Sequence, residues 1–277
     1  MAITADIPRG TVAADLLFYK APADGSAPYD YVGQAPEGEA QQNFSEVPHT
    51  VEIHDIRGIE GDFSLDVDGF HTVSNAKSSA KIDFSSDNDI RAKYYPEVEQ
   101  LLRQQLPGTT KVTIFDHTIR RSSPDADRGP VTSVHADQTA RSGPWRVLLH
   151  DPEDAKELLK RRVRIINVWR PLNGPVRGFP LGLASRRFMD GSDVVPVEHR
   201  YPDRIGETAA IRYNPTQQFS YWSGMTNDER LLIKCYDSSD PRDGPQGVPH
   251  AAFVDERTEP ADRYRESIEV RTIVYGG

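Results

Sequence analysis

The chain has 277 residues, of which 37% are hydrophobic and 27% charged, with 21 prolines and 20 glycines. This composition is typical of a loop-rich globular protein whose length can bury one large core. The net charge of −9 argues against nucleic-acid binding, which usually needs a basic face. Cys235 is the single cysteine, which excludes an internal disulfide and a cysteine zinc site. Because the sequence has neither a secretory signal pattern nor an apolar run of about 18 residues, we expect a cytoplasmic protein without a membrane partner.

The first part of the sequence predicts strands and one helix. A strand begins near Thr11 and ends in a loop rich in Pro, Gly and Ser. Residues 63–70 alternate apolar and polar side chains, which is the period of a half-buried strand. Residues 92–106 have apolar positions at helical spacing and are followed by a Pro-Gly stop, so a helix is predicted there.

The later part predicts mainly strands. Residues 110–123 alternate as a strand, and a second helix is predicted from Asp151 to about Arg162, where Asp-Pro-Glu-Asp supplies a cap and early negative charge. A strand over 162–172 leads into a long Pro/Gly-rich connection that ends near residue 202. Short strands with few helices indicate an α+β, mainly β protein built around an antiparallel barrel or sandwich. The last predicted strands lie within 209–215, 231–238 and 266–275.

The segment VHADQT contains a histidine and an aspartate two residues apart. In a strand such residues share a face, so His135 and Asp137 would project side by side. Two histidines and one carboxylate with open positions are the ligand set of non-haem iron(II) oxygenases, so a third ligand must come from elsewhere. Taken alone, the pattern is explained as well by a chance salt bridge on a surface strand.

Downstream residues offer that third ligand and an anion clamp. His250 begins an apolar segment and is the favoured ligand, while His199, in a loop, is the alternative. Arg265 and Ser267 share a face of the last strand, where a guanidinium and a hydroxyl suit a carboxylate. Arg271 lies on the same face.

Three further residues have both a structural and a functional interpretation. Asn167 and Trp169 share a face of an otherwise apolar strand, and a polar residue there needs a partner. Either a hydrogen bond from the sheet to a loop or a role in an active site would supply that partner. His117 could line a pocket or be a hydrogen-bonded core histidine.

The order His-x-Asp, a long gap, His and then Arg-x-Ser resembles the 2-oxoglutarate/iron(II) dioxygenases with a double-stranded β-helix, or jelly-roll, fold. More narrowly, the chain resembles the fungal hydroxylase/desaturase family of natural-product clusters, of the aspergillic acid type, to which a gibberellin desaturase and a cephamycin 7-hydroxylation protein are related. The resemblance implies a single domain over 1–277, in which 1–110 pack on a jelly-roll core of 111–277 with an insertion near 170–202. The matching segments are FDHTIRRS, VHADQT, IINVWRPL, LLIKCYDS, PHAAF and RESIEVR.

The resemblance also implies a chemistry. It implies iron(II) on His135, Asp137 and His250, with 2-oxoglutarate as co-substrate and O2 as oxidant. Arg265 and Ser267 would hold the distal carboxylate. Arg271 is the alternative anchor, because the gap after the second histidine is slightly stretched. Asn167 and Trp169 would complete the cofactor site.

The implied reaction is hydroxylation, desaturation or cyclisation of a small-molecule secondary metabolite by C–H activation, and a homodimer is compatible with it. Two alternatives remain open. One is a cupin-type metalloenzyme that does not use 2-oxoglutarate, and the other is a non-catalytic jelly-roll binding protein.

Overall fold

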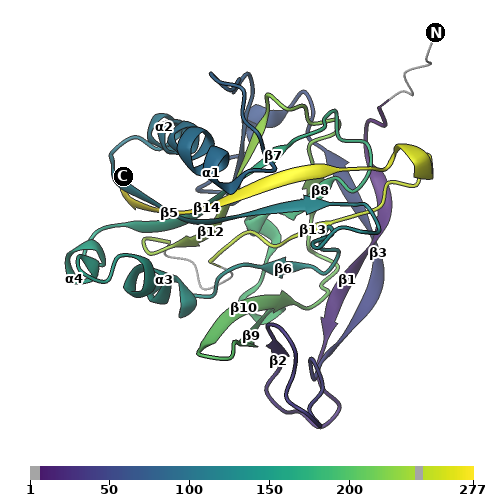
Figure 1. Cartoon of the computed structure of the whole chain (residues 1–277). Helices are drawn as coiled ribbons and strands as arrows, with labels where there is room; N and C mark the ends of the chain where they lie inside the picture. The colour runs from purple at the N-terminus through teal and green to yellow at the C-terminus, as the bar shows by residue number, and fades with distance from the viewer. Residues whose placement is uncertain (1–6, 241–245) are drawn as a thin grey trace.

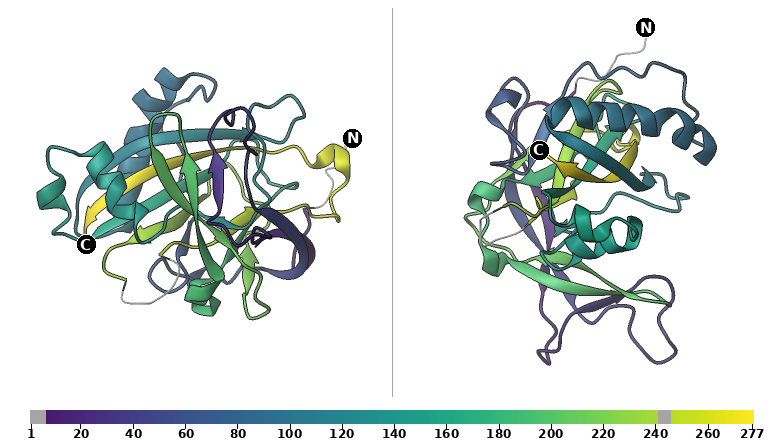
Figure 2. Two further views of the ribbon diagram at one scale, coloured as in Figure 1. Left: turned by 90° about the horizontal axis from the view of Figure 1, so that it is seen from below. Right: turned by 90° about the vertical axis from the view of Figure 1, so that its left-hand side faces the viewer.

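Apolar and alternating strands pair into two β-sheets that pack face to face, with the helices outside them (Figure 1). The computed structural model describes residues 7–240 and 246–277. The first six residues, which belong to the N-terminal segment predicted to lack a secretory signal, lie outside the described residues. In the described part of the chain, no helix combines the length and apolarity needed to cross a membrane. Figure 2 shows β9 and β10 of one sheet (green) crossing β5 and β14 of the other (teal and yellow).

The smaller sheet has five strands, all antiparallel to their neighbours. Its central strand β7 is buried along its whole length, including the polar residues Arg164, Asn167 and Arg170. In order across the sheet, the strands are β4 (Phe70–Val73), β12 (Arg230–Asp237), β7 (Val163–Pro171), β14 (Glu266–Gly276) and β5 (Thr109–Arg121).

Helix α2 (Tyr95–Gln105) lies on the outer face of the smaller sheet (Figure 2). It follows the short α1 (Asp87–Asp89) and a π-helical turn over Ile90–Tyr94. Its buried Leu102 packs in one apolar cluster with Ile268 of β14. Full burial of a leucine contributes about 1.5–3 kcal/mol, so this contact holds the helix against the sheet.

The larger sheet has nine strands and curls back on itself. Leu17 of its first strand bridges Ser133, and the Val134 amide donates to the Leu17 carbonyl at 2.8 Å, next to the start of β6. The curl encloses an apolar core that includes Leu16 and Phe219. In order, the strands are β1 (Val12–Lys20), β3 (Ser45–Asp55), β11 (Phe219–Tyr221), β8 (Leu181–Ala184), β13 (His250–Ala252), β6 (His135–Ala136), β10 (Ile205–Ile211), β9 (Val194–Arg200) and β2 (Tyr29–Tyr31).

A β-bulge in β5 decides which of its side chains face the larger sheet. Arg271 of β14 lies opposite Asp116, whereas the next residue, Thr272, lies opposite Ile114. Phe115 is therefore the extra residue, and such a bulge reverses the alternation of side chains beyond it. After the bulge, Thr118 points into the space between the sheets.

Two predicted elements are wrong. Residues 63–70 form a turn rather than a strand, because the buried Asp68 carboxylate accepts from the Ser64 amide at 3.0 Å and from Arg187 Nε at 2.8 Å. The helix predicted from Asp151 is reduced to α4 (Ala155–Leu158). Asp151 accepts instead from Tyr275 Oη at 2.6 Å, so it is not available as a cap.

The other predicted elements are present with shifted ends. The helix expected over 92–106 is α2, and the strands expected over 110–123, 162–172, 231–238 and 266–275 are β5, β7, β12 and β14. Helix α3 (Ser142–His150) was not predicted. The long connection to residue 202 contains β8 and β9, both paired within the larger sheet. The remaining short helical turns are Glu60–Asp62, Arg186–Phe188, Gly191–Asp193 and Pro260–Asp262.

Candidate active site

Two neighbouring strands of the larger sheet bring together the histidines that the sequence keeps far apart. His250 of β13 lies directly opposite His135 of β6, and their ring centroids are 4.6 Å apart. Asp137 follows immediately after β6, with its Oδ1 3.5 Å from His135 Nε2. One ligand atom from each of the three residues lies within 4.8 Å of the others, so the group could hold a metal ion.

Backbone carbonyls fix the orientation of both histidine rings. His135 Nδ1 lies 2.8 Å from the Ser133 carbonyl, and His250 Nδ1 lies 3.0 Å from the Val248 carbonyl. A carbonyl only accepts, so each Nδ1 carries the proton and each Nε2 keeps its lone pair for a metal. Burial, with the neighbouring His250, lowers the pKa of His135 to about 4, which keeps the ring neutral near pH 7.

Asp137 is held as a carboxylate by its neighbours. Burial alone would raise its pKa, but His250, His135, Arg271 and the Asn167 amide together hold that pKa below its usual range. Asn167, fully buried in β7, donates Nδ2–H to Asp137 Oδ2 at 2.5 Å. Two neutral imidazoles and one carboxylate fit iron(II), and among the described residues no fourth His, Cys, Asp or Glu joins the group.

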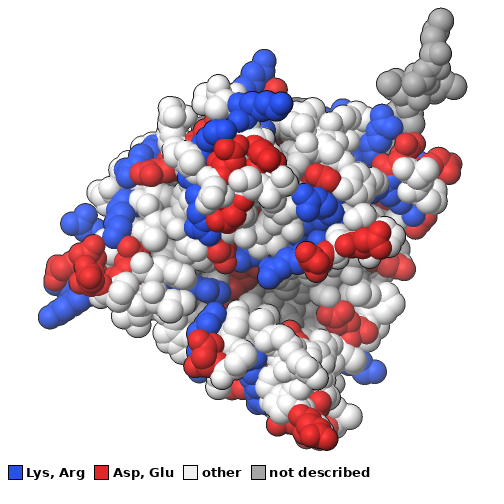
Figure 3. Space-filling view, viewed as in Figure 1, with Lys and Arg blue, Asp and Glu red and all other residues white. Residues whose placement is uncertain are grey.

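The three residues open into a cavity between the two sheets. Figure 3 shows the surface hollowed in the middle of this face, below β5 and β14 and above β9 and β10. One wall comes from the larger sheet and the loops beside it, and the other from β5, β7 and β14. The lining residues are Thr118, Arg120, Val131, His135, Asp137, Trp169, Leu181, His250, Ala252, Arg265, Ser267, Glu269 and Arg271.

Arg265 has the properties of an anion-binding residue. It is 2% exposed, and its Nη1 donates to the Phe179 carbonyl, while its buried Nε has no hydrogen-bond partner among the described residues. Its guanidinium lies 5.6 Å from the centroid of the Trp169 ring. Burial and the nearby Arg120 lower the pKa of Arg265 to about 9, so an anion here would relieve an uncompensated charge.

Arg271 lines the same cavity but is already paired. Its Nη1 donates to the Asp116 carboxylate at 2.9 and 3.1 Å, and its Nε donates to Glu269 at 3.2 Å. Its Nη2 donates to Thr118 Oγ1 at 2.8 Å. With three polar partners, Arg271 is less available than Arg265 to a bound carboxylate.

Two sequence candidates lie elsewhere. His117 points away from the metal group, toward α2, where its Nδ1 is 2.9 Å from Tyr95 Oη. His199 Nε2 lies 2.9 Å from Thr208 Oγ1, and His199 is not a member of the ligand group. The proposed alternative third ligand is therefore wrong.

The sequence analysis did not identify three polar residues of the cavity: Thr118, Arg120 and Glu269. Glu269 could have been predicted, since it lies two residues from both Ser267 and Arg271 and therefore on the same face of the predicted strand. Thr118 and Arg120 could not, because the bulge at Phe115 determines their direction.

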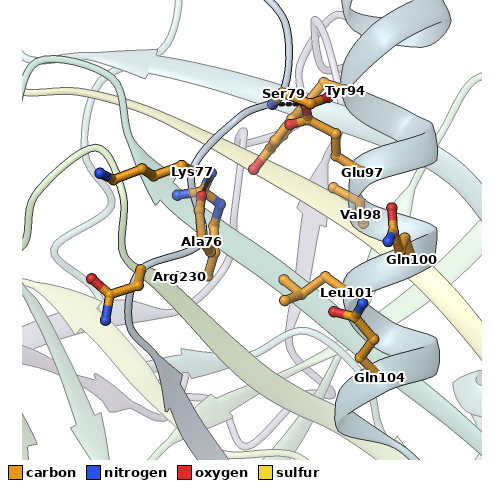
Figure 4. A pocket seen from close by; sticks show the side chains of 11 residues that line it. Ala76, Lys77, Ser79, Tyr94, Glu97, Val98, Gln100, Leu101, Gln104 and Arg230 are labelled. Atoms are coloured by element: carbon orange, nitrogen blue, oxygen red, sulfur yellow. Dashed lines mark hydrogen bonds between the residues drawn. The ribbon is translucent and has the colours of Figure 1, made fainter.

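A second cavity, of about 320 Å³, lies on the outer side of the smaller sheet. Figure 4 shows Gln100, Leu101 and Gln104 projecting into it from α2, with Lys77 and Arg230 on the opposite side. Its lining includes no histidine, aspartate or cysteine, so it lacks the ligand chemistry of the first cavity.

Two packed sheets with two histidines and a carboxylate on the larger one define the class of jelly-roll proteins with a non-haem iron ligand set. A protein-family profile described as an oxidoreductase/YMDC permease-like domain matches residues 16–275. The hydroxylase/desaturase poxK of Penicillium oxalicum is 30% identical, over 97% of this chain and 92% of its own. The Fe(II)/2-oxoglutarate-dependent dioxygenase nvfI of Aspergillus novofumigatus is 30% identical, over 95% of this chain and 96% of its own. The solved structure of the iron and alpha-ketoglutarate-dependent endoperoxidase NvfI superposes with a TM-score of 0.85 at 28% identity, covering 98% of this chain and 100% of that chain.

The chain belongs to this family of hydroxylase/desaturases and Fe(II)/2-oxoglutarate-dependent dioxygenases. The family resemblance inferred from the sequence motifs is thereby confirmed. The predicted fold class, mainly β with a jelly-roll core and a few helices, is confirmed with it. So is the prediction of an oxidoreductase with iron(II) and 2-oxoglutarate as cofactors.

Proposed function

We propose that the chain oxidises a C–H bond of a small-molecule secondary metabolite, by hydroxylation, desaturation or ring closure, with its iron on His135, Asp137 and His250. The observation that carries this proposal is that one cavity contains both the ligand group and Arg265, a buried arginine that makes no ion pair within the described part of the chain. When bound, iron(II) and 2-oxoglutarate activate dioxygen for attack on the substrate.

The residues of the chain position the reactants. Arg265 and Ser267 bind the distal carboxylate of 2-oxoglutarate, which places the 2-oxo acid end toward the metal group. Asn167 holds Asp137 in one orientation. Trp169 packs against the Arg265 guanidinium and restricts its movement. Arg271, occupied by Asp116 and Glu269, shapes the cavity wall.

The first test is a visible spectrum recorded without oxygen. Adding Fe(II) and then 2-oxoglutarate should produce a weak charge-transfer band that needs both additions. The band should be absent in Asp137→Ala and retained in His199→Ala, a control that removes a nearby histidine outside the ligand group. Succinate formation in air would then serve to screen substrates.

The same spectrum separates the alternatives. Tight iron binding without a band would support a cupin-type enzyme that uses no 2-oxo acid. Absence of iron binding would support a non-catalytic binding protein and contradict the proposal. The buried arginine argues against the first alternative, and the complete ligand group argues against the second.

Two broader expectations remain proposals. A homodimer is supported by apolar side chains exposed on and near α3, where Leu148 and Leu149 are 53% and 51% exposed and Ile205 is 58% exposed. Light scattering at two concentrations tests it. Cytoplasmic location is tested by imaging a tagged chain in its host.

A further inference from the structure

Strands β5 and β14 present a ladder of polar side chains to the cavity. Arg120 lies opposite Ser267, Glu269 opposite Thr118, and Arg271 opposite Asp116. Arg265 stands one step beyond Ser267 on the same face, and its amide donates to Ser122 Oγ at 2.7 Å. Arg120 and Arg265 are thus diagonal neighbours, within reach of each other's long side chains.

Arg265 is buried and Arg120 is partly buried, and each lacks the paired acid that usually accompanies a guanidinium group in such a position. In the described part of the chain, neither has a carboxylate within 4.0 Å, although Arg271 on the same face has two. Within residues 7–240 and 246–277, the one side-chain hydrogen bond of Arg120 runs from Nη1 to the Gly129 carbonyl, at 3.0 Å and exposed to solvent. Burial lowers the pKa of Arg120 as well as that of Arg265. The positive charge of Arg120 contributes to the lowered pKa of Arg265, so an anion shared by the two guanidinium groups would offset their mutual repulsion.

We infer that Arg120 is a second cation of the 2-oxoglutarate site and that it holds the distal carboxylate together with Arg265 and Ser267. This inference rests on the proposed function, and it adds a positioning residue from β5, a strand outside the Arg-x-Ser motif. A carboxylate between the two guanidinium groups accepts from both, and Ser267 is next to each of them, directly opposite Arg120 and two residues after Arg265.

Glu269 is the other group that could engage Arg120, since it lies on the opposite diagonal. It accepts from Arg271 Nε at 3.2 Å and makes no ion pair with Arg120. Glu269 attracts Arg120 electrostatically but is already bound by Arg271, so Arg120 can still donate to an anion beside Arg265.

The test measures binding, not turnover. Wild type, Arg120→Met and Arg120→Lys are loaded with Mn(II) and titrated calorimetrically with 2-oxoglutarate and with 2-oxobutyrate, a 2-oxo acid that lacks the distal carboxylate. Arg121→Met is the matched control, because the neighbouring Arg121 points to the other face and pairs with Glu266. Thermal unfolding of each variant verifies the fold.

We expect Arg120→Met to raise the Kd of 2-oxoglutarate at least about tenfold, which equals about 1.4 kcal/mol. Its Kd for 2-oxobutyrate should stay within about twofold of wild type, Arg120→Lys should recover part of the loss, and Arg121→Met should change neither value. An unchanged Kd for 2-oxoglutarate in Arg120→Met would overturn the inference. So would an equal loss for both acids, which would indicate an effect on the metal group or the fold.

Failure of the inference is distinguishable from failure of the proposed function. If wild type binds 2-oxoglutarate and Arg265→Met does not, while Arg120→Met binds normally, only the role of Arg120 is wrong. If Mn(II)-loaded wild type binds neither acid, the proposed function fails and the inference fails with it.

Discussion

Replacing Asn167 with alanine should weaken metal binding without unfolding the protein. The Asn167 amide donates to Asp137 Oδ2 at 2.5 Å, and Asn167 is fully buried. A buried hydrogen bond to a charged group contributes about 1.5–3 kcal/mol. Loss of a partner that orients a metal ligand typically lowers affinity about 10- to 100-fold, which is the same magnitude. We therefore expect the Kd of Mn(II) to rise by about that factor in Asn167→Ala.

The assay is a calorimetric titration of the metal-free protein with Mn(II), accompanied by urea unfolding. Thr272→Val is the control, because Thr272 is equally buried on the strand beside β7 and donates to the Ile166 carbonyl at 2.7 Å, away from Asp137. It should lower the free energy of unfolding but leave the Kd of Mn(II) unchanged. A wild-type Kd in Asn167→Ala, or an equal loss in Thr272→Val, would refute the reasoning.

Three further predictions concern the same cavity. His135→Gln should abolish tight Mn(II) binding in calorimetry with little change in unfolding, because the ring acts as a ligand. Folding lowers the pKa of His135 from its usual value near 6.5 to about 4, so between these two pH values the unfolded chain binds more protons at His135 than the folded chain does. The metal-free wild type should therefore lose stability as the pH falls through this window. His135→Gln should show a shallower loss in a pH series of thermal unfolding, and an identical slope would contradict this. Arg271→Met should lower the free energy of unfolding in urea by about 2 kcal/mol, because Glu269 and Asp116 lose their partner. The same substitution should raise the Kd of 2-oxoglutarate less than Arg265→Met does. The reverse order of affinities would make Arg271 the anchor.

Side-chain alternation allowed parts of the site to be predicted from the sequence. Arg265, Ser267 and Arg271 lie on one face of β14, as the period of two requires, and all three line the cavity. Asn167 and Trp169 share a face of β7 in the same way, and each contacts a residue of the site. These predictions need only local geometry.

Other features depend on contacts that local patterns do not encode. The turn at 63–70 is stabilised by Arg187, far along the chain, which binds Asp68. Asp137 lies beyond the end of the two-residue strand β6, so its proximity to His135 depends on Asn167 as well as on alternation. The direct pairing of His250 with His135 follows from the order of strands in the larger sheet, which a single sequence does not reveal.

The bulge at Phe115 lets one strand face two environments. Ile114 packs in the apolar cluster with α2, whereas Thr118 lines the cavity, although strict alternation would put both side chains on one face. Deleting Phe115 would leave Ile114 opposite Thr272 and Asp116 opposite Arg271, now as consecutive residues, so the side chains on both sides of the deletion would keep their faces. A strand of the same length that lost the bulge would instead slip by one residue, so that Asp116, Thr118 and Arg120 would turn toward α2 and the residues between them would enter the cavity. Divergence of substrate preference in this family therefore has a route through the register of β5, in addition to replacement of cavity side chains.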